Sequence, residues 1–324
     1  MRFVYDNFRN KPFKPLYNAL VPKSYRKKWH YNYSEIPTQM RVAEFWQDAI
    51  TKYQKGELAR YDLPVKRPEL VGKKIIWQYW GQGLDNLPEV AKLCFASVDK
   101  FAGEYQVMRL TDTTFNEYVD FPEFVEQKRQ LADFRPAYFS DLLRTALIKN
   151  YGGVWLDASV FLTDQLPHNY TKYDFFVFSR DPQSPYQAWG AGNADCYFNW
   201  NSEFKVNFLN SIIFGKPNNS IATVMLDLLL YFWENQTKVQ HYFFYQILLN
   251  ELKEMRIVAF DFPVVDDTYP HLLQFDLNKP FDKVRYDYIT QKSSLHKLSF
   301  HKKSKDSNNH TFYQYIKHQF LNDC

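Results

Sequence analysis

Apolar positions along the chain follow two spacings, one typical of strands and one typical of helices. Short apolar runs predict strands at residues 75–80 (IIWQYW), 105–110 (YQVMRL) and 154–162 (VWLDASVFL). Helical spacing predicts a helix beginning near Pro88, one from Pro136 to about residue 150, and later helices over 220–234 and 241–252. Strands that alternate with helices favour βαβ units, so we expect an α/β fold with a sheet flanked by helices.

The same pattern divides the chain into three regions. Residues 1–70 combine a basic, aromatic segment with a predicted helix over 40–55 and a linker that contains Pro64 and Pro68. Residues 71–300 hold the alternating strands and helices, and we expect them to form the main domain. Residues 301–324 are polar and rich in lysine, and we expect a tail in which 304–309 is mobile.

The helix that begins at Pro136 leads directly into a strand that ends in a carboxylate. Helical spacing places Asp141 and Arg144 on one side of this helix, and Gly152 and Gly153 stop it. Asp157 then follows the strand at its carboxyl end, where open α/β sheets bind their ligands. The alternative is that Asp141 and Arg144 form a surface ion pair and that Asp157 only caps a turn.

The first predicted strand also leads into a loop that suits a ligand. Gly81 and Gly83 allow the backbone of this loop to approach a bound molecule closely. An exposed aromatic side chain there could stack on a nucleotide base. Trp77 and Trp80 are equally well explained as core residues, because most large aromatic side chains serve packing.

Charge is distributed unevenly along the chain, although the net charge is only +4. Eight Lys and Arg residues lie within the first 30 positions, interleaved with aromatic residues. Such a segment could lie on an anionic membrane surface, or it could be a solvated arm that packs its aromatics on the domain. Nucleic acid is not an expected partner, since the rest of the chain is close to neutral and has no recognisable reading motif.

Membrane spans and disulfide frameworks are not expected. No stretch approaches about 20 uninterrupted apolar residues, and the amino end has no apolar segment typical of a signal peptide. Cys94, Cys196 and Cys324 are too few and too scattered for a disulfide framework or a zinc site. We therefore expect a cytoplasmic protein, with peripheral contact at the inner face of the membrane as an option.

Two segments together resemble a known family. SDLLR…YGGVWLDAS (140–159) and KIIWQYWGQG (74–83) resemble the core of capsular polysaccharide synthesis glycosyltransferases, which are related to glycosyltransferase family 32. The resemblance implies a GT-A fold, that is, a Rossmann-like mixed sheet flanked by helices. It also implies that residues 71–178 bind a nucleotide sugar and that residues 179–300 recognise the acceptor.

The resemblance further implies the roles of particular residues. Donor binding is expected from Trp77, Gln78, Tyr79, Asp141, Arg144, Asp157, Ala158 and Lys297. Catalytic roles are expected for Asp157, Arg144 and Gln246, and a divalent cation, Mn²⁺ or Mg²⁺, is expected on Asp157, Ser159 and His296. The family pattern has a second aspartate where this chain has Ser159, and a hydroxyl adds no charge, so weaker metal binding is expected. Small Ala158 is a candidate selector of the donor sugar.

The reaction implied by the resemblance is the transfer of a hexose, galactose or glucose, from a UDP-sugar to a lipid-linked capsular or cell-wall saccharide, with retention of configuration. Gln246 resembles an amide that lies near the anomeric carbon in retaining relatives. Two other classes of protein remain open: a glycoside hydrolase, which needs two carboxylates around the bond that it cleaves, and a non-catalytic sugar-binding protein of the cell envelope.

Overall fold

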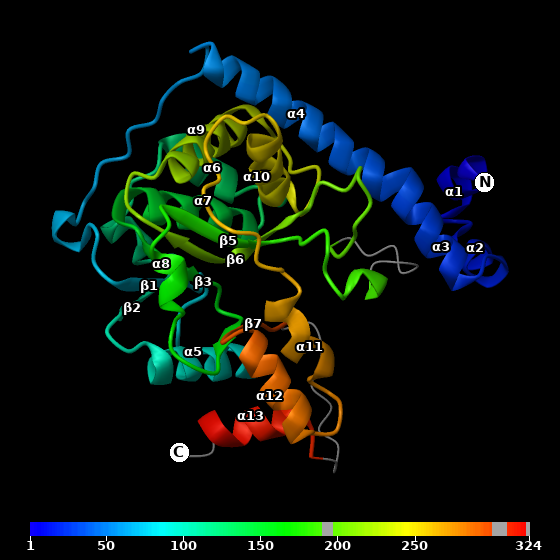
Figure 1. The fold of residues 1–324 in the computed structure, drawn as a ribbon. Helices are drawn as coiled ribbons and strands as arrows, with labels where there is room; N and C mark the ends of the chain where they lie inside the picture. Colours follow the sequence, from blue (N-terminus) through cyan, green and yellow to red (C-terminus); the bar gives the residue numbers. More distant parts are fainter. Residues whose placement is uncertain (190–196, 300–309, 322–324) are drawn as a thin grey trace.

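The protein is built around a five-stranded mixed sheet, seen in a computed structural model that describes residues 1–189, 197–299 and 310–321 (Figure 1). The strands lie in the order β2-β1-β3-β6-β5. Their bounds are β1 Ile75–Tyr79, β2 Gln106–Leu110, β3 Gly153–Leu156, β5 Phe175–Ser179 and β6 Phe208–Gly215. β1 pairs in parallel with β2 and β3, whereas β6 is antiparallel to β3 and β5. This confirms the predicted α/β class with a mixed sheet.

Helices cover both faces of this sheet. The larger core lies on one face, where four buried tryptophans, Trp46, Trp77, Trp155 and Trp233, belong to one hydrophobic cluster. The helices on that side are α4 Ile36–Gln54, α6 Glu123–Arg129, α7 Pro136–Tyr151, α9 Ser220–Asn235 and α10 Phe244–Glu254. The other face packs against α5 Glu89–Phe101 and α8 His168–Thr171. Strands β1, β3, β5 and β6 bury both of their faces, which explains their nearly continuous apolar runs, whereas the edge strand β2 is only partly buried.

The turn between α7 and β3 requires its two glycines. Gly152 has φ 72° and Gly153 has φ 97°, a backbone conformation that other residues rarely adopt. A Cβ atom on Gly153 would lie 2.6 Å from the carbonyl oxygen of Ile75 on the neighbouring strand. The glycines therefore end the helix, as the sequence predicted, and they also let β3 pair closely with β1.

A second, smaller sheet lies beside the main one. β4 Val160–Leu162 pairs antiparallel with β7 Leu295–Lys297. The surrounding elements are α11 Leu272–Asp276, α12 Lys283–Lys292 and α13 Phe312–Leu321. Phe312, Tyr313 and Ile316 of α13 are buried. The expectation of a polar tail is therefore wrong for residues 312–321, whose apolar side chains recur at helical spacing; residues 304–309, expected to be mobile, lie outside the described part.

The first helices form a small bundle that projects from the sheet domain at the end of α4 (Figure 1). Its helices are α1 Arg2–Phe8, α2 Lys14–Leu20 and α3 Lys23–His30, and a π-helical turn, Tyr31–Glu35, joins it to α4. A helical N-terminal segment was predicted, but the separate bundle was not. No helix in the described part of the chain is long and apolar enough to cross a membrane.

Three details differ from the sequence-based expectation. The apolar run 154–162 forms two strands, β3 and β4, because Asp157, Ala158 and Ser159 turn the chain from one sheet to the other. Helix α10 begins at Phe244, so His241 and Tyr242 precede it. Finally, β6 from the later half of the main domain lies between β3 and β5 of the earlier half, so both halves share one sheet.

Candidate active site

A cavity of about 540 Å³ opens at the carboxyl ends of β1 and β3. These two strands are parallel, so the residues that follow them meet at one edge of the sheet. Trp80 follows β1, Asp157 follows β3, α7 contributes Asp141 and Arg144, and β7 contributes Lys297. The volume lies within the range of about 300–1,000 Å³ that is typical of small-molecule sites.

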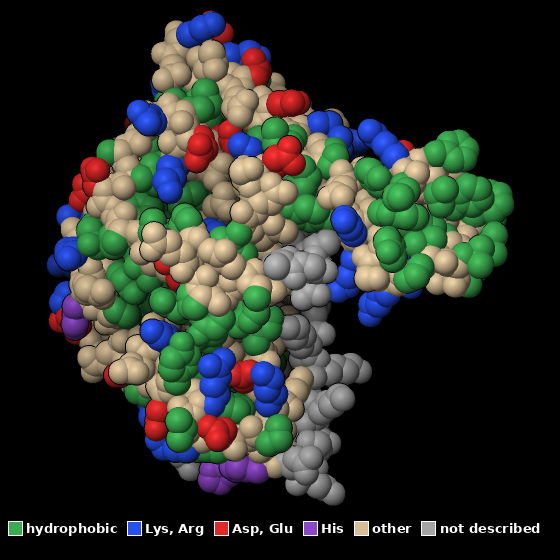
Figure 2. Space-filling model, turned by 45° about the vertical axis from the view of Figure 1, so that its right-hand side comes forward, with side chains coloured by type: hydrophobic (Ala, Val, Ile, Leu, Met, Phe, Trp, Pro, Cys, Tyr) green, Lys and Arg blue, Asp and Glu red, His purple; other side chains and the backbone are tan. Residues whose placement is uncertain are grey.

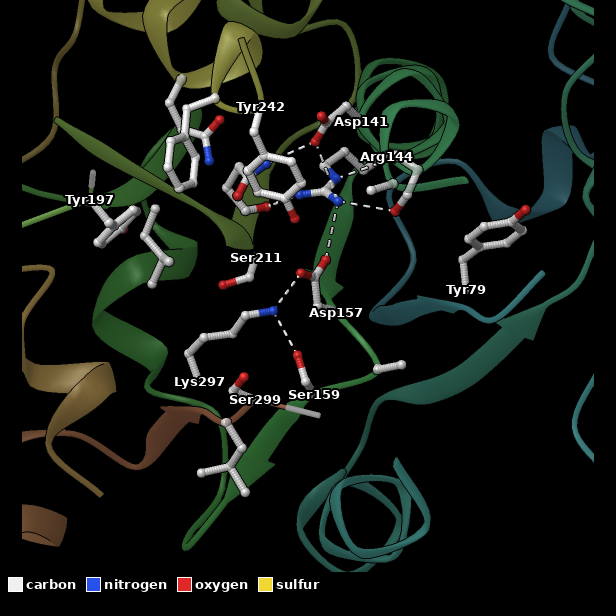
Figure 3. A pocket seen from close by; sticks show the side chains of 18 of the residues that line it. Tyr79, Asp141, Arg144, Asp157, Ser159, Tyr197, Ser211, Tyr242, Lys297 and Ser299 are labelled. Carbon is white, nitrogen blue, oxygen red and sulfur yellow. Dashed lines mark hydrogen bonds and ion pairs between the residues drawn. The ribbon is translucent and has the colours of Figure 1, made fainter. Parts of the chain in front are cut away.

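Asp157 is held between two cations at the centre of this cavity (Figure 3). Its Oδ1 lies 3.2 Å from a guanidinium nitrogen of Arg144 and accepts a hydrogen bond of 2.8 Å from Trp155 Nε1. Its Oδ2 accepts a hydrogen bond of 2.7 Å from Lys297 Nζ. Burial by itself would raise the pKa of Asp157, but Arg144 and Lys297 lower it to about 2. The carboxylate is therefore ionised at neutral pH.

Arg144 connects Asp157 to Asp141, which lies on the same side of α7, as predicted. One guanidinium nitrogen of Arg144 lies 3.4 Å from Asp141 Oδ1, and another donates to the carbonyl oxygen of Asn210 at 2.5 Å. Asp141 also accepts a hydrogen bond of 2.8 Å from Asn210 Nδ2. Both charged residues are only 4% exposed, so the alternative of a surface ion pair is wrong.

The two carboxylates differ in their electrostatic surroundings. Burial raises the pKa of Asp141 to about 7, because Arg144 offsets the loss of water only in part. Asp157 has two cations and a lowered pKa. The cavity thus presents one ionised carboxylate and one carboxyl group that gains or loses a proton close to neutral pH.

Lys297 reaches the cavity because of the register of the small sheet. Val160 lies opposite Lys297 on β4, and Leu298 N donates to Ser159 O at 2.8 Å. Alternate residues on a strand face opposite sides, so the side chain of Lys297 lies with Asp157, whereas that of His296 is directed into the core. Lys297 Nζ also donates to Ser159 Oγ at 2.6 Å.

Several buried polar atoms in the wall of the cavity have no hydrogen-bond partner among the described residues. Ser211 Oγ on β6 and Gln246 Oε1 on α10 are two of them, and both amide atoms of Gln274 on α11 are further ones. Buried polar groups are normally paired, so unpaired ones in a cavity wall are positions where a ligand can bind. Gln246, predicted as an amide near the reacting carbon, lies in this wall.

Trp77 and Gln78 do not reach the cavity, which corrects the expectation that they contact a ligand. Trp77 is 0% exposed, donates to Gly152 O at 2.9 Å and packs on Tyr118 and Tyr151. Gln78 lies on the opposite face of β1 and accepts from Arg109 Nε at 3.0 Å. The alternative interpretation of Trp77 as a core residue was correct, and the aromatic residues of this segment in the cavity wall are Tyr79 and Trp80.

Tyr79 and Ala158 both line the cavity, as expected. The hydroxyl of Tyr79 donates to Asp112 Oδ1, which also pairs with Arg129 at 2.6 Å. Ala158 is 5% exposed and lies between Asp157 and Ser159. A larger side chain at position 158 would therefore occupy part of the cavity.

The three expected metal ligands do not converge. His296 is 0% exposed, packs on Phe161, and its Nε2 lies 3.1 Å from Thr163 Oγ1. Burial lowers its pKa to about 3. Asp157 and Ser159 are bridged by the Lys297 ammonium group instead. Within the described residues, no group of three or more His, Cys, Asp or Glu side chains could hold a metal ion.

Several cavity residues were missed by sequence reasoning. Asn210 and Ser211 lie on β6, and His271 precedes α11. The Nδ1 of His271 donates to Asp267 O at 2.8 Å, and burial lowers the pKa of its ring to about 4, so the imidazole is neutral at pH 7. None of these residues belongs to a local motif, and only the antiparallel pairing of β6 with β3 brings two of them to the site.

A family profile matches most of the chain. The profile of the family described as Capsular polysaccharide synthesis protein covers residues 26–316. This match includes the main domain and reaches from α3 into α13. It confirms the resemblance to capsular polysaccharide synthesis proteins, and the relation to glycosyltransferase family 32 stays a prediction.

Two curated relatives match over part of their length. O-glycosyltransferase braB of Annulohypoxylon truncatum is 25% identical over 204 residues, which are 60% of this chain and 45% of the relative. O-glycosyltransferase PaGT of Phomopsis amygdali is 22% identical over 174 residues, 51% of this chain and 40% of the relative. The matched region thus spans less than half of each relative. Among solved structures, PaToxG Glycosyltransferase aligns over 69% of this chain and 79% of its own, at 16% identity and a TM-score of 0.35.

Proposed function

We propose that this chain, which belongs to the capsular polysaccharide synthesis protein family, is a glycosyltransferase that uses a UDP-sugar as donor. The observation that carries the proposal is the pairing of Asp157 with Arg144 and Lys297 inside the cavity at the carboxyl edge of the sheet. A nucleotide sugar needs a carboxylate for its hydroxyl groups and cations for its diphosphate, and these groups lie next to one another here. The names of both curated relatives agree with a transferase.

The proposed reaction breaks the bond between the anomeric carbon and the β-phosphate oxygen, and the electron pair stays on that oxygen. The acceptor hydroxyl oxygen bonds to the anomeric carbon and its proton goes to the departing phosphate, which retains the configuration. Lys297 stabilises the charge that grows on the phosphate. Asp157 binds sugar or ribose hydroxyls, Arg144 holds Asp157 in place, and the Gln246 amide lies beside the anomeric carbon.

Retention is supported by the state of the basic groups in the cavity. An inverting enzyme needs a general base with a pKa near the working pH. The pKa values of Asp157, about 2, and of His271, about 4, are too low for efficient proton abstraction at neutral pH. Asp141 has a pKa of about 7, but its carboxyl group is engaged by Arg144 and Asn210. Analysis of the product anomer by NMR tests this point, since an inverted product would assign the base to His271 or Asp141.

We further propose a hexose, galactose or glucose, as the transferred sugar, with Ala158 limiting the space at its ring. Ala158→Thr should then change the preference between UDP-galactose and UDP-glucose, and an unchanged preference would count against this role. The assay is hydrolysis of a panel of nucleotide sugars, with transfer to lipid-linked saccharides as the second stage. UDP-sugar hydrolysis that persists in Asp157→Ala would point to a contaminating activity.

A lipid-linked acceptor is supported by the N-terminal bundle. The first 30 residues contain eight Lys and Arg and one acidic residue, Asp6, a net charge of +7, against +4 for the whole chain. Figure 2 shows hydrophobic side chains gathered on the projecting bundle, with Lys and Arg side chains at its edge. The large apolar side chains exposed there are Met1, Phe3, Val4, Phe13, Leu16, Leu20 and Tyr25. An apolar surface with basic residues around it matches an anionic lipid surface.

Flotation with phosphatidylglycerol and phosphatidylcholine vesicles tests membrane contact. We expect binding to the anionic vesicles only, and loss of binding in the double variant Phe3→Glu, Leu20→Glu. Val284→Glu is the matched control, because Val284 is 79% exposed on α12 in another part of the molecule. Equal flotation of all three proteins would refute the contact.

A glycoside hydrolase is the second candidate, because the pKa values of Asp141 and Asp157 are shifted in opposite directions. The pairing of Asp157 with two cations argues against it, since a nucleophile or base held in this way is a weak one. Cleavage of aryl glycosides without any response to nucleotide sugars would favour the hydrolase. Sugar binding without turnover of either substrate would favour a non-catalytic protein.

A further inference from the structure

We propose that the ammonium group of Lys297 is the built-in counter-charge for the donor diphosphate, so that this chain binds its donor without a divalent cation. The inference rests on the proposed function and concerns the same site. It differs from the expectation of a bound Mn²⁺ or Mg²⁺, and it is argued from the arrangement of Asp157, Ser159 and Lys297.

The residues at the motif do not fit a divalent cation. Hard cations such as Mg²⁺ and Mn²⁺ need several oxygen ligands, commonly with more than one carboxylate. Here both oxygens of Asp157 are already engaged, Oδ1 by Arg144 and Trp155 and Oδ2 by Lys297. Ser159 is neutral, and His296 is directed into the core. A cation bound between Asp157 and Ser159 would have to displace an ammonium group that fits there.

The position of Lys297 is fixed by backbone structure. The β4–β7 ladder sets Lys297 opposite Val160, one residue beyond Ser159. The hydrogen bond from Leu298 N to Ser159 O continues the pairing past the end of the strands. The backbone of Lys297 therefore cannot move away from Asp157 and Ser159 unless the small sheet opens, which keeps its ammonium group within reach of both residues.

Lys297 still has the capacity to bind an anion. An ammonium group has three N–H donors, and the hydrogen bonds to Asp157 and Ser159 use two of them. The side chain of Lys297 is 25% exposed and lines the cavity, so the remaining donor is accessible to a ligand. The single charge of the ammonium group at this point attracts a diphosphate and repels a divalent cation.

The test is a calorimetric titration of the full chain with UDP, in EDTA and then in Mn²⁺. We expect the same dissociation constant within about twofold in both buffers, and a loss of affinity of 10-fold or more in Lys297→Met. Lys292→Met is the matched control, since Lys292 is an exposed lysine at the end of α12 and should leave the affinity unchanged. Thermal melting establishes that the variants are folded.

A second variant tests the inference by a gained dependence on metal, and not only by a loss of affinity for UDP. Lys297→Glu places a carboxylate beside Asp157 and Ser159, so its UDP binding should be lost in EDTA and regained in Mn²⁺. The inference is overturned if the wild type needs Mn²⁺ to bind UDP, or if Lys297→Met binds as the wild type does. In both of those cases UDP still binds, so the proposed function stands. If the wild type binds UDP in neither buffer, the inference and the proposed function are overturned together.

Discussion

Two clusters of buried charge in this molecule have similar composition and different surroundings. The pocket cluster consists of Asp141, Arg144, Asp157 and Lys297. The second cluster, here called the buried pair, consists of Arg180, which follows β5, and Asp267. Arg180 donates to both oxygens of Asp267, at 2.8 and 2.9 Å, and the side chains are only 4% and 0% exposed.

The difference is that the buried pair is closed and the pocket cluster is open. Two further donors of Arg180 bond to the carbonyl oxygens of Asn199 and Tyr197. In the pocket cluster, Asp157 and Lys297 are 21% and 25% exposed, and Ser211 Oγ and Gln246 Oε1 nearby have no partner among the described residues. A closed ion pair serves the fold, whereas an open one has groups available for a ligand.

The largest effect on stability should come from the buried pair. Asp267→Asn leaves the Arg180 charge buried without compensation, and we expect a loss of about 3–5 kcal/mol in the free energy of unfolding. Urea denaturation measures it. The neighbouring Asp266→Asn is the control and should cost less, because Asp266 makes no ion pair and its Oδ2 has no hydrogen-bond partner within the described residues. Equal losses in both variants would break the comparison.

Substitution in the pocket cluster should reduce activity more than stability. Asp157→Asn should lower the rate of UDP-sugar turnover by about 100- to 1,000-fold, or about 3–4 kcal/mol in the barrier. Its unfolding free energy should change less than that of Asp267→Asn, because Arg144 keeps Asp141 and Asn210 as partners. Asp164→Asn, an exposed site seven residues later, serves as the control for rate. If Asp157→Asn keeps the wild-type rate, Asp157 has no role in the reaction.

The raised pKa of Asp141 predicts a dependence of stability on pH. Burial raises this pKa to about 7 from an ordinary value of 3.8, so the folded state holds an extra proton between about pH 4 and 7. The wild type should therefore lose stability as the pH rises through that window, by about 2 kcal/mol between pH 5 and 7. Asp141→Asn cannot titrate, so its unfolding free energy relative to the wild type should increase by that amount. Urea denaturation at pH 5 and pH 7 measures both proteins. If the difference in unfolding free energy between the wild type and Asp141→Asn is the same at both pH values, the raised pKa of Asp141 is contradicted.

Trp77 of β1 and Trp80, which follows β1, test with a smaller effect the same distinction between residues that serve the fold and residues that are available to a ligand. Trp80 lines the cavity, so Trp80→Leu should weaken UDP binding by about 1 kcal/mol, the lower end for a base stacked on an aromatic ring. Trp77→Leu should destabilise the fold, since Trp77 is completely buried, and should leave the affinity of the folded protein close to that of the wild type. Calorimetry and thermal melting of both variants separate the two outcomes. A reversal of these effects would place the ligand elsewhere.

The sequence predicted the parts of the site that depend on local pattern. Asp141, Arg144 and Asp157 were singled out by the spacing of one helix, a glycine turn and a strand end, and the family resemblance favoured them as site residues; all three line the cavity. Trp77 and Trp80 could not be told apart, because a short apolar run does not show where its strand ends. His296 and Lys297 were placed at the site together by resemblance. Only the register of β4 with β7 shows that Lys297 faces Asp157 and that His296 is directed into the core.

The fold was predicted to a similar extent. Helices α7 and α9 and the strands β1 to β3 follow from apolar spacing within single segments. The order of the sheet does not, because β6 enters between β3 and β5 through pairings that join distant segments. For the same reason Asn210 and Ser211, which β6 brings to the cavity, were not predicted.

A crystal structure of the protein with UDP, grown in EDTA, tests the account most directly. We predict that the diphosphate lies within hydrogen-bond distance of Lys297 Nζ, with the uracil ring against Trp80 and no metal ion between Asp157 and Ser159. UDP bound outside this cavity, or bound here with its diphosphate away from Lys297, would contradict the account.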